Sequence, residues 1–171
     1  MAQVSPARVK VKEIKQIAIA VKDIEKTVAA YWNILGIGPW EIRTWESPVV
    51  YDRKYRGKEI TSVEKLAHAQ VGSVELELCQ PVKGDSIYQD FINEHGEGLH
   101  HLKFIVDDVD GAAAILAEEG FPSLQSGHFG PPEERGGYSY IYIEPLHAVW
   151  EPVCRGKGGI LPGETTRYPA D

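Results

Sequence analysis

The chain has 171 residues, of which 43% are hydrophobic and 25% are charged. This length allows one core, or two small modules that share a core, and excludes two large domains. A formal net charge of −7 disfavours nucleic acid as a partner, and the absence of any apolar run near the roughly 20 residues of a membrane span predicts no membrane contact.

The N-terminal residues and the cysteines indicate the compartment. Residues 1–12 have no firm structural signal and lack the apolar core of a secretion signal. The only cysteines, Cys79 and Cys154, have no CxxC spacing and fit reduced thiols better than a disulfide framework. We therefore expect a cytoplasmic protein.

The first half of the chain predicts one helix and four strands. Hydrophobic alternation and capping signals indicate a strand at 14–21, a helix at 24–35 and a strand near 39–45. A long, irregular charged stretch follows, and then strands at 62–71 and 74–80. Gly72-Ser73 suits a tight turn between these last two strands, since glycine readily adopts positive φ.

The second half repeats this order after a connector. Residues 82–97 form the connector, with a helix at 86–94. Then come a strand at 99–106, a helix at 109–118, and strands near 121–126, at 138–144 and at 147–153. The Gly/Pro-rich loop 127–137 is a candidate mobile lid, and the Gly/Pro-containing tail from Arg155 is expected to be poorly ordered.

Two segments of the chain are copies of one unit. Gln16–Asp23 and His101–Asp108 align without a gap at a separation of 85 residues, and each ends in an aspartate suited to cap the next helix. The sequence therefore predicts an α+β fold of two βαβββ modules. We expect a single domain, residues 1–171, with module one at about 13–81, the connector at 82–97, module two at about 98–154 and a tail at 155–171.

Four polar residues occupy matching places in the two copies. Gln16 and His101 begin the first strands, and Glu77 and Glu151 lie on the polar faces of the last strands. One imidazole, one amide oxygen and two carboxylates suit a divalent metal such as Zn, Ni, Co, Mn or Fe. Such a metal is a Lewis acid that stabilises negative charge developing on an enolate.

Other polar and aromatic residues are candidates for the same site. A two-residue turn at Gly72-Ser73 places His68 across from Glu77, where it would orient the carboxylate, transfer protons or merely pack. Tyr142 stands as far before Glu151 as His68 does before Glu77, so it is the matching candidate. Lys103 shares the polar face of its strand, and we expect it to meet the carboxylates or a carboxylate of the substrate. Trp40 is a candidate pocket wall, with core packing as the alternative.

The chain resembles the vicinal oxygen chelate superfamily of glyoxalases, bleomycin-resistance proteins and extradiol dioxygenases, and within it the methylmalonyl-CoA epimerase-like proteins. The segments that carry the resemblance are Ile17–Gly36 (IAIAVKDIEKTVAAYWNILG), Val74–Pro81 (VELELCQP), Asp85–Val106 (DSIYQDFINEHGEGLHHLKFIV) and Val149–Val153 (VWEPV). The resemblance implies paired βαβββ modules around a metal, with the family's four ligands at Gln16, Glu77, His101 and Glu151.

The ligand set departs from that of the epimerases. Those proteins usually have His at the first ligand position, where this chain has Gln16, and the set Gln, Glu, His, Glu is instead similar to that of lactoylglutathione lyases. Ala20 and Cys79-Gln80 stand where those lyases carry residues used around glutathione, which argues against glutathione as a substrate. Extradiol dioxygenases need two His ligands, and this chain offers one.

The resemblance implies an enolising enzyme that needs an acid or base beside the metal. By motif position Glu59 is the nearest match to the epimerase base, although a solvated loop charge is the alternative, and the lyase resemblance gives Glu151 a role in proton exchange. We expect a metal-dependent isomerase or epimerase that stabilises an enediolate on the metal. The alternatives are a lactoylglutathione lyase-like enzyme and a non-catalytic small-molecule binding protein. The expected partners are a small-molecule substrate, with an acyl-CoA as one candidate, and a second copy of the chain in a homodimer.

Overall fold

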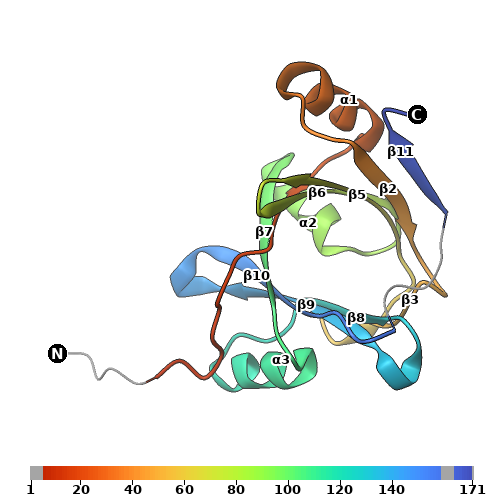
Figure 1. The fold of residues 1–171 in the computed structure, drawn as a ribbon. Coiled ribbons are helices and arrows are strands. Elements are labelled where there is room, and N and C mark those ends of the chain that lie inside the picture. The colour runs from red at the N-terminus through yellow and green to blue at the C-terminus, as the bar shows by residue number, and fades with distance from the viewer. Residues whose placement is uncertain (1–5, 159–163, 171) are drawn as a thin grey trace.

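The computed structural model describes residues 6–158 and 164–170 and contains two βαβββ modules in one chain (Figure 1). Module one comprises β1 (Gln16–Ala20), α1 (Ile24–Leu35), β2 (Trp40–Trp45), β5 (Val63–Val71) and β6 (Val74–Lys83). After α2 (Ile87–His95), module two comprises β7 (Gly98–Ile105), α3 (Val109–Glu118), β8 (Gln125–Phe129), β9 (Gly136–Ile143) and β10 (Ala148–Cys154). The α+β class and the two repeated modules are thus as the sequence predicts.

The helices begin and end where local chemistry requires. The Asp23 carboxylate accepts a hydrogen bond from Lys26 N at 2.9 Å, and the Asp108 carboxylate accepts one from Gly111 N at 3.0 Å. Helix α1 ends at Gly36, which adopts φ 67° and so forms a left-handed cap that a side chain would strain. These caps fix the angle at which each helix returns over its own sheet.

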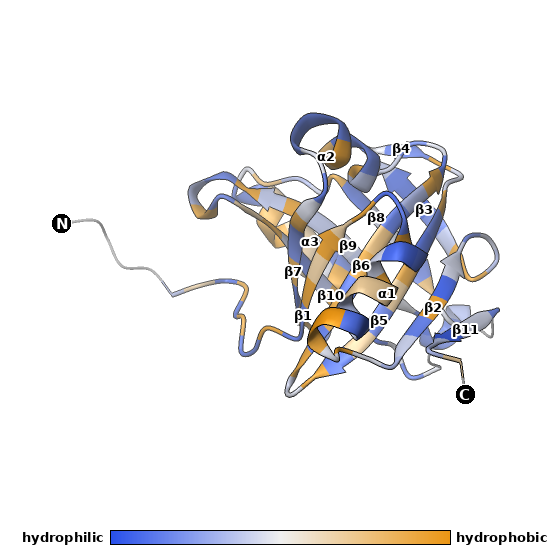
Figure 2. Cartoon of the chain, turned by 90° about the horizontal axis from the view of Figure 1, so that it is seen from above, coloured by the Kyte–Doolittle hydropathy of each residue, from blue (hydrophilic) through white to orange (hydrophobic). Residues whose placement is uncertain are grey.

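All strands in the described part of the chain form one curved sheet, in the order β11-β2-β5-β6-β1-β7-β10-β9-β8-β3-β4. Helices α1 and α3 lie on opposite outer sides of this sheet in Figure 1. The apolar side chains of α1, Ile24 and Val28, pack with Trp40, Ala67 and Leu78 on the outer face of module one. Figure 2 shows the hydrophobic strand surfaces beneath α1. The opposite, concave face is left for polar side chains.

The two modules meet along β1 and β7, which pair antiparallel. Gln16 pairs with Lys103, and Ala18 pairs with His101. Because the repeat separation is 85 residues, each of these pairs is the counterpart of the other, so the modules are related by an approximate twofold axis between the strands. This pairing brings the first strands of both modules, and with them Gln16 and His101, to the centre of the sheet.

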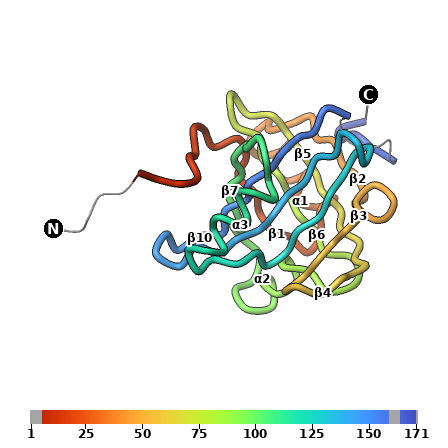
Figure 3. Tube along the Cα trace, turned by 90° about the horizontal axis from the view of Figure 1, so that it is seen from below, coloured from red at the N-terminus to blue at the C-terminus, as the bar shows by residue number. Residues whose placement is uncertain are grey.

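Three segments differ from the prediction. The stretch expected to be irregular, 46–61, contains β3 (Val50–Tyr55) and β4 (Lys58–Glu59), and β3 pairs with β8 of module two (Figure 3). The strand expected near 121–126 is β8, at 125–129, so the expected lid 127–137 is partly strand and includes the short helix η1 (Pro132–Glu134). Within the tail, β11 (Thr165–Tyr168) pairs with β2.

Gly127 accounts for the difference between the predicted and observed positions of β8. Gly127 lies opposite Tyr138 within β8, and a Cβ there would be 2.8 Å from the Tyr138 hydroxyl, which favours glycine at this position. A glycine inside a strand is easily mistaken for a loop residue. No helix among the described residues is long and apolar enough to cross a membrane.

Candidate functional site

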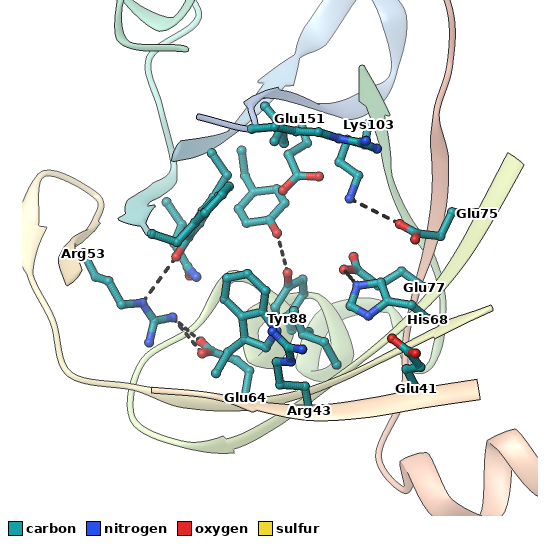
Figure 4. A pocket seen from close by; sticks show the side chains of 18 residues that line it. Glu41, Arg43, Arg53, Glu64, His68, Glu75, Glu77, Tyr88, Lys103 and Glu151 are labelled. Carbon is teal, nitrogen blue, oxygen red and sulfur yellow. Dashed lines mark hydrogen bonds and ion pairs between the residues drawn. The ribbon is translucent and has the colours of Figure 1, made fainter. Parts of the chain in front are cut away.

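The concave face of the sheet encloses a cavity of about 420 Å³ (Figure 4). Both modules contribute to its wall, since each strand sends alternate side chains inward. On β10, for example, Glu151, Val153 and the following Arg155 all line it. The cavity therefore lies between the modules of a single chain.

His101 lies between the two carboxylates that the sequence pairs with it. Its Nε2 atom is 3.3 Å from Glu77 Oε2 and 3.3 Å from Glu151 Oε2. All three side chains are buried. The fold thus brings together residues from β6, β7 and β10 that are far apart in the sequence.

Several ligand-type atoms of the four predicted residues have no hydrogen-bond partner. Gln16 Oε1, His101 Nε2 and Glu151 Oε2 are buried and unsatisfied, although such atoms are nearly always paired in folded proteins. The amide nitrogen of Gln16 donates to Glu75 Oε1 at 2.6 Å, which leaves the amide oxygen unoccupied. An imidazole nitrogen, an amide oxygen and carboxylates are suitable donors for a divalent metal, so the residues present fit such an ion.

The charges of these groups depend on one another. Burial opposes a charge on His101, but Glu151 and Glu77 outweigh it and raise the pKa of His101 to about 9. Burial likewise opposes ionisation of Glu77, yet the neighbouring His101 and His68 hold the pKa of Glu77 well below its usual value. In the metal-free protein a proton on His101 therefore compensates the two carboxylates.

The candidate ligands are themselves held by further hydrogen bonds. His68 Nε2 lies 2.8 Å from Glu77 Oε1, and β5 and β6 place these two residues directly opposite each other, as the two-residue turn predicts. His100 Nδ1 lies 2.9 Å from His101 Nδ1, which directs His101 Nε2 toward the carboxylates. Burial, with the neighbouring His101, keeps the pKa of His100 well below its ordinary value, so His100 is neutral. Such contacts orient metal ligands.

Lys103 and Cys79 also lie beside the candidate ligands. Lys103 lines the cavity, and its Nζ is 3.5 Å from Glu75 Oε1 (Figure 4). Cys79 Sγ donates to Glu77 Oε2 at 3.2 Å, and Glu77, Cys79 and His101 bring their ligand atoms within 4.8 Å of one another. Burial, reinforced by Glu77, raises the pKa of the Cys79 thiol well above its ordinary value, so the metal-free protein holds it protonated.

Tyr140, rather than Tyr142, faces Glu151. The connection between β9 and β10 is the short helix η2 (Glu144–Leu146), not a two-residue turn, and Val149 pairs with Tyr142. This register puts Tyr140 opposite Glu151, with its ring centroid 4.8 Å from that of His101. Tyr142 is exposed and does not line the cavity. The sequence spacing predicts Tyr142 instead of Tyr140 because it assumes turns of equal length in the two modules.

Two further candidates lie outside the cavity wall. Trp40 is fully buried in the outer core, where its ring lies 5.5 Å from that of Tyr31, so it packs rather than walls the site. Glu59 is exposed on β4 at the far edge of the sheet and does not line the cavity. Glu59 therefore lies on the edge hairpin of β3 and β4, apart from the candidate ligands on β1, β6, β7 and β10.

The cavity also contains groups that the sequence did not single out. The hydroxyls of Tyr88, from α2, and Tyr140 are 2.6 Å apart. At the other end of the cavity Arg53 donates to both carboxylate oxygens of Glu64 at 2.7 Å, and both residues are buried (Figure 4). Glu64 alternates with Leu66 and His68 on β5, which is a signal of a shared face, whereas Arg53 lies in a stretch without alternation.

Comparisons with known proteins point to one family. The model of the Glyoxalase/Bleomycin resistance protein/Dioxygenase superfamily matches residues 15–142. The uncharacterized protein YqjC of Bacillus subtilis is 27% identical over 147 residues, which cover 85% of this chain and 93% of that protein. Human mitochondrial methylmalonyl-CoA epimerase is 29% identical over 112 residues, which cover 65% of this chain and 56% of that protein.

Solved structures share the fold at low identity. A hypothetical protein, BH1468, from Bacillus halodurans superposes with a TM-score of 0.59 at 18% identity, covering 85% of this chain and 95% of that one. A variant of Streptomyces coelicolor methylmalonyl-CoA epimerase in complex with 2-nitronate-propionyl-CoA superposes with a TM-score of 0.58 at 22% identity. The match covers 90% of this chain and 100% of that one. With a family model that spans most of its length, the chain belongs to the Glyoxalase/Bleomycin resistance protein/Dioxygenase superfamily.

Proposed function

We propose that this protein is a metal-dependent isomerase that removes a proton from the carbon next to a carbonyl or thioester group and returns it to the other face. The observation that carries this proposal is that Gln16 Oε1, His101 Nε2 and Glu151 Oε2 are buried without hydrogen-bond partners. In addition, His101 Nε2 lies 3.3 Å from both Glu77 Oε2 and Glu151 Oε2. These four residues would hold the metal. When bound, a divalent metal supplies Lewis-acid stabilisation of the negative charge that enolisation places on an oxygen.

The chain's own residues supply the remaining functions. Glu151 also lines the cavity, and its carboxylate, when not held by the metal, would accept and return a proton. His68 lines the same cavity and is hydrogen-bonded to Glu77, so it would orient that carboxylate and serve as a second proton-transfer group. Tyr88 and Tyr140 stay protonated, since burial raises the pKa of both phenols well above the ordinary value. One hydroxyl of the pair can therefore donate to a substrate oxygen.

Methylmalonyl-CoA is the first substrate to test, because epimerases of this substrate are among the relatives in sequence and fold. The metal-loaded protein should exchange the proton at the carbon between the two carbonyl groups in deuterated buffer, as followed by NMR. The Glu151→Gln variant should lose this exchange. If the wild-type protein loads metal but exchanges no proton, the epimerase assignment fails for this substrate.

A second candidate is a lyase or isomerase that acts on a hemithioacetal. The observation that favours it is Gln16 at the first ligand position, the ligand set that is similar to that of lactoylglutathione lyases. Formation of a thioester from methylglyoxal and glutathione, followed in the ultraviolet, would support it. A non-catalytic binding protein should purify without stoichiometric metal, and its Glu77→Ala variant should retain ligand affinity.

A further inference from the structure

Two arginines of the cavity wall have no carboxylate partner among the residues that the structure describes. Arg43 comes from β2 of module one, and Arg155 directly follows β10 of module two. The other cationic side chains of the wall are engaged, since Arg53 pairs with Glu64 and Lys103 lies near Glu75. Arg43 and Arg155 are therefore the cations left for a ligand.

Backbone contacts fix the segment around Arg155, and β11 contacts the side chain of Arg43. Next to Arg155, Gly156 adopts φ 64° and packs so tightly that a Cβ there would lie 2.3 Å from Glu134 O. Lys157 N donates to that same carbonyl oxygen at 3.2 Å. On the other side, Arg43 pairs with Thr165 of β11, and its Nε donates to Thr165 Oγ1 at 3.2 Å. Figure 1 shows β11 lying along β2.

The charge balance of the cavity favours an anion once a dication is present. Its wall carries the five carboxylates Glu41, Glu64, Glu75, Glu77 and Glu151 and the four cations Arg43, Arg53, Lys103 and Arg155. With a divalent metal bound and His101 neutral as its ligand, the formal balance is therefore one positive charge. Glu41, which is included in this balance, lies two residues before Arg43 on the same face. Its carboxylate would repel an anion, so a bound anion must contact the arginines at a point away from Glu41.

The positions of the arginines limit the length of the ligand. Arg155 lies four residues beyond Glu151 on the same face, or about 13 Å between Cα atoms, and an extended arginine side chain can cover part of that span. Leu66 and Val153 line the wall between them. A ligand held at both ends would need a short apolar chain between its metal-binding oxygens and its anionic group.

We propose that Arg43 and Arg155 form a subsite for the carboxylate or phosphate group of a substrate, at the end remote from the candidate metal centre. This inference rests on the proposed function, because it assumes that the reacting oxygens bind at Gln16, Glu77, His101 and Glu151. Guanidinium groups suit this task, since their paired N–H groups match the geometry of a carboxylate or phosphate. The subsite makes the substrate an anionic carbonyl compound.

Matched chelating probes test the subsite on the zinc-loaded full-length protein. The monohydroxamate of glutaric acid offers a metal-binding end and a distant carboxylate, and its primary amide has the same shape without the charge. The acid should bind about tenfold more tightly than the amide in isothermal titration calorimetry, and added salt should weaken only the acid. A third probe, with a phosphonate in place of the carboxylate, identifies the preferred anion by its relative affinity.

Variants distinguish the subsite from the metal centre. Arg43→Gln and Arg155→Gln should each weaken the acid about fivefold and leave the amide unchanged, as expected for a partly exposed charged pair. Lys58→Gln, which removes one charge from the exposed β4, should change neither affinity. Equal affinities of acid and amide in the wild-type protein, or equal losses for both probes in the arginine variants, would overturn the subsite alone. If none of the probes binds, the metal-based function fails together with it.

Discussion

At the scale of single residues, the site is a set of ligand atoms whose neighbours determine their charge and direction. His101 shows this best, because His100 occupies one ring nitrogen and two carboxylates flank the other. The proton that this arrangement holds in the metal-free protein occupies the place that a metal would take. Proton and metal should therefore compete.

We predict that metal binding releases a proton from His101. The pKa of His101 is raised to about 9, so at pH 7 the imidazole is charged, whereas a metal ligand must be neutral. The apparent affinity should rise by up to about tenfold per pH unit as the pH increases toward 9, and then level off. Calorimetry at pH 7 in buffers of different ionisation enthalpy should detect release of about one proton. Affinity that does not change between pH 7 and pH 9 would contradict this account.

A second prediction concerns His68, which supports Glu77 without being one of the candidate ligands. Removing its 2.8 Å hydrogen bond in His68→Ala should weaken zinc binding by about 10- to 100-fold, the usual effect of losing a group that orients a ligand. His95→Ala is the matched control, because His95 is exposed on α2, and it should bind zinc normally. Competition against a fluorescent chelator measures both variants. A wild-type affinity in His68→Ala would show that Glu77 needs no support.

At the scale of elements, β3 shows how a segment of one module completes the other. It follows β2 in sequence but pairs with β8, and Arg53 reaches from it to Glu64 on β5. Arg53 also donates to Ser62 O at 2.6 Å, so the buried guanidinium joins the two edges of the cavity. This ion pair lies at the end of the cavity opposite Glu77 and His68 (Figure 4).

Loss of this ion pair should destabilise the fold strongly. Arg53→Leu leaves the Glu64 carboxylate buried without its partner, and we expect the free energy of unfolding to fall by about 3–5 kcal/mol. Arg56→Leu, which breaks an exposed pair with Asp90, should cost only about 0–1 kcal/mol. Urea unfolding followed by tryptophan fluorescence gives both values. The double change Arg53→Leu with Glu64→Leu should recover most of the loss, and failure to do so would assign the effect to packing.

The sequence pattern predicts the repeated helices and strands and the connector helix α2, but it does not predict β3, β4 or β11. His68 was placed opposite Glu77 because a two-residue turn fixes the register of β5 and β6. The same two-residue turn, assumed for module two, predicts Tyr142 opposite Glu151. The connection there contains η2, and the register places Tyr140 opposite Glu151. Arg53 gave no signal, since the register of β3 shifts between Tyr51 and Lys54 and breaks the alternation. Tyr88 enters the cavity from the connector helix, whose direction depends on tertiary packing.

At the scale of the whole molecule, the candidate ligands come from both modules of one chain. Gln16 and Glu77 belong to β1 and β6, whereas His101 and Glu151 belong to β7 and β10. The cavity wall is likewise assembled from both modules, with Glu77 from module one and Glu151 from module two. The internal repeat of the sequence therefore predicts the two-module fold and the matching positions of the candidate ligands. It does not predict the subunit arrangement.

A metal held by both modules should stabilise the molecule as a unit. Ligand that binds only the folded state adds about 2.7 kcal/mol of stability at a free concentration one hundred times its dissociation constant. We therefore expect zinc to raise the melting temperature at pH 7, with one ion per chain by elemental analysis, and a chelator to reverse the shift. Glu77→Ala should abolish the increase, whereas Glu59→Ala, at an exposed position outside the cavity, should retain it. Half an ion per chain would mean that two chains share one site, which would contradict the arrangement of the four ligands within a single chain.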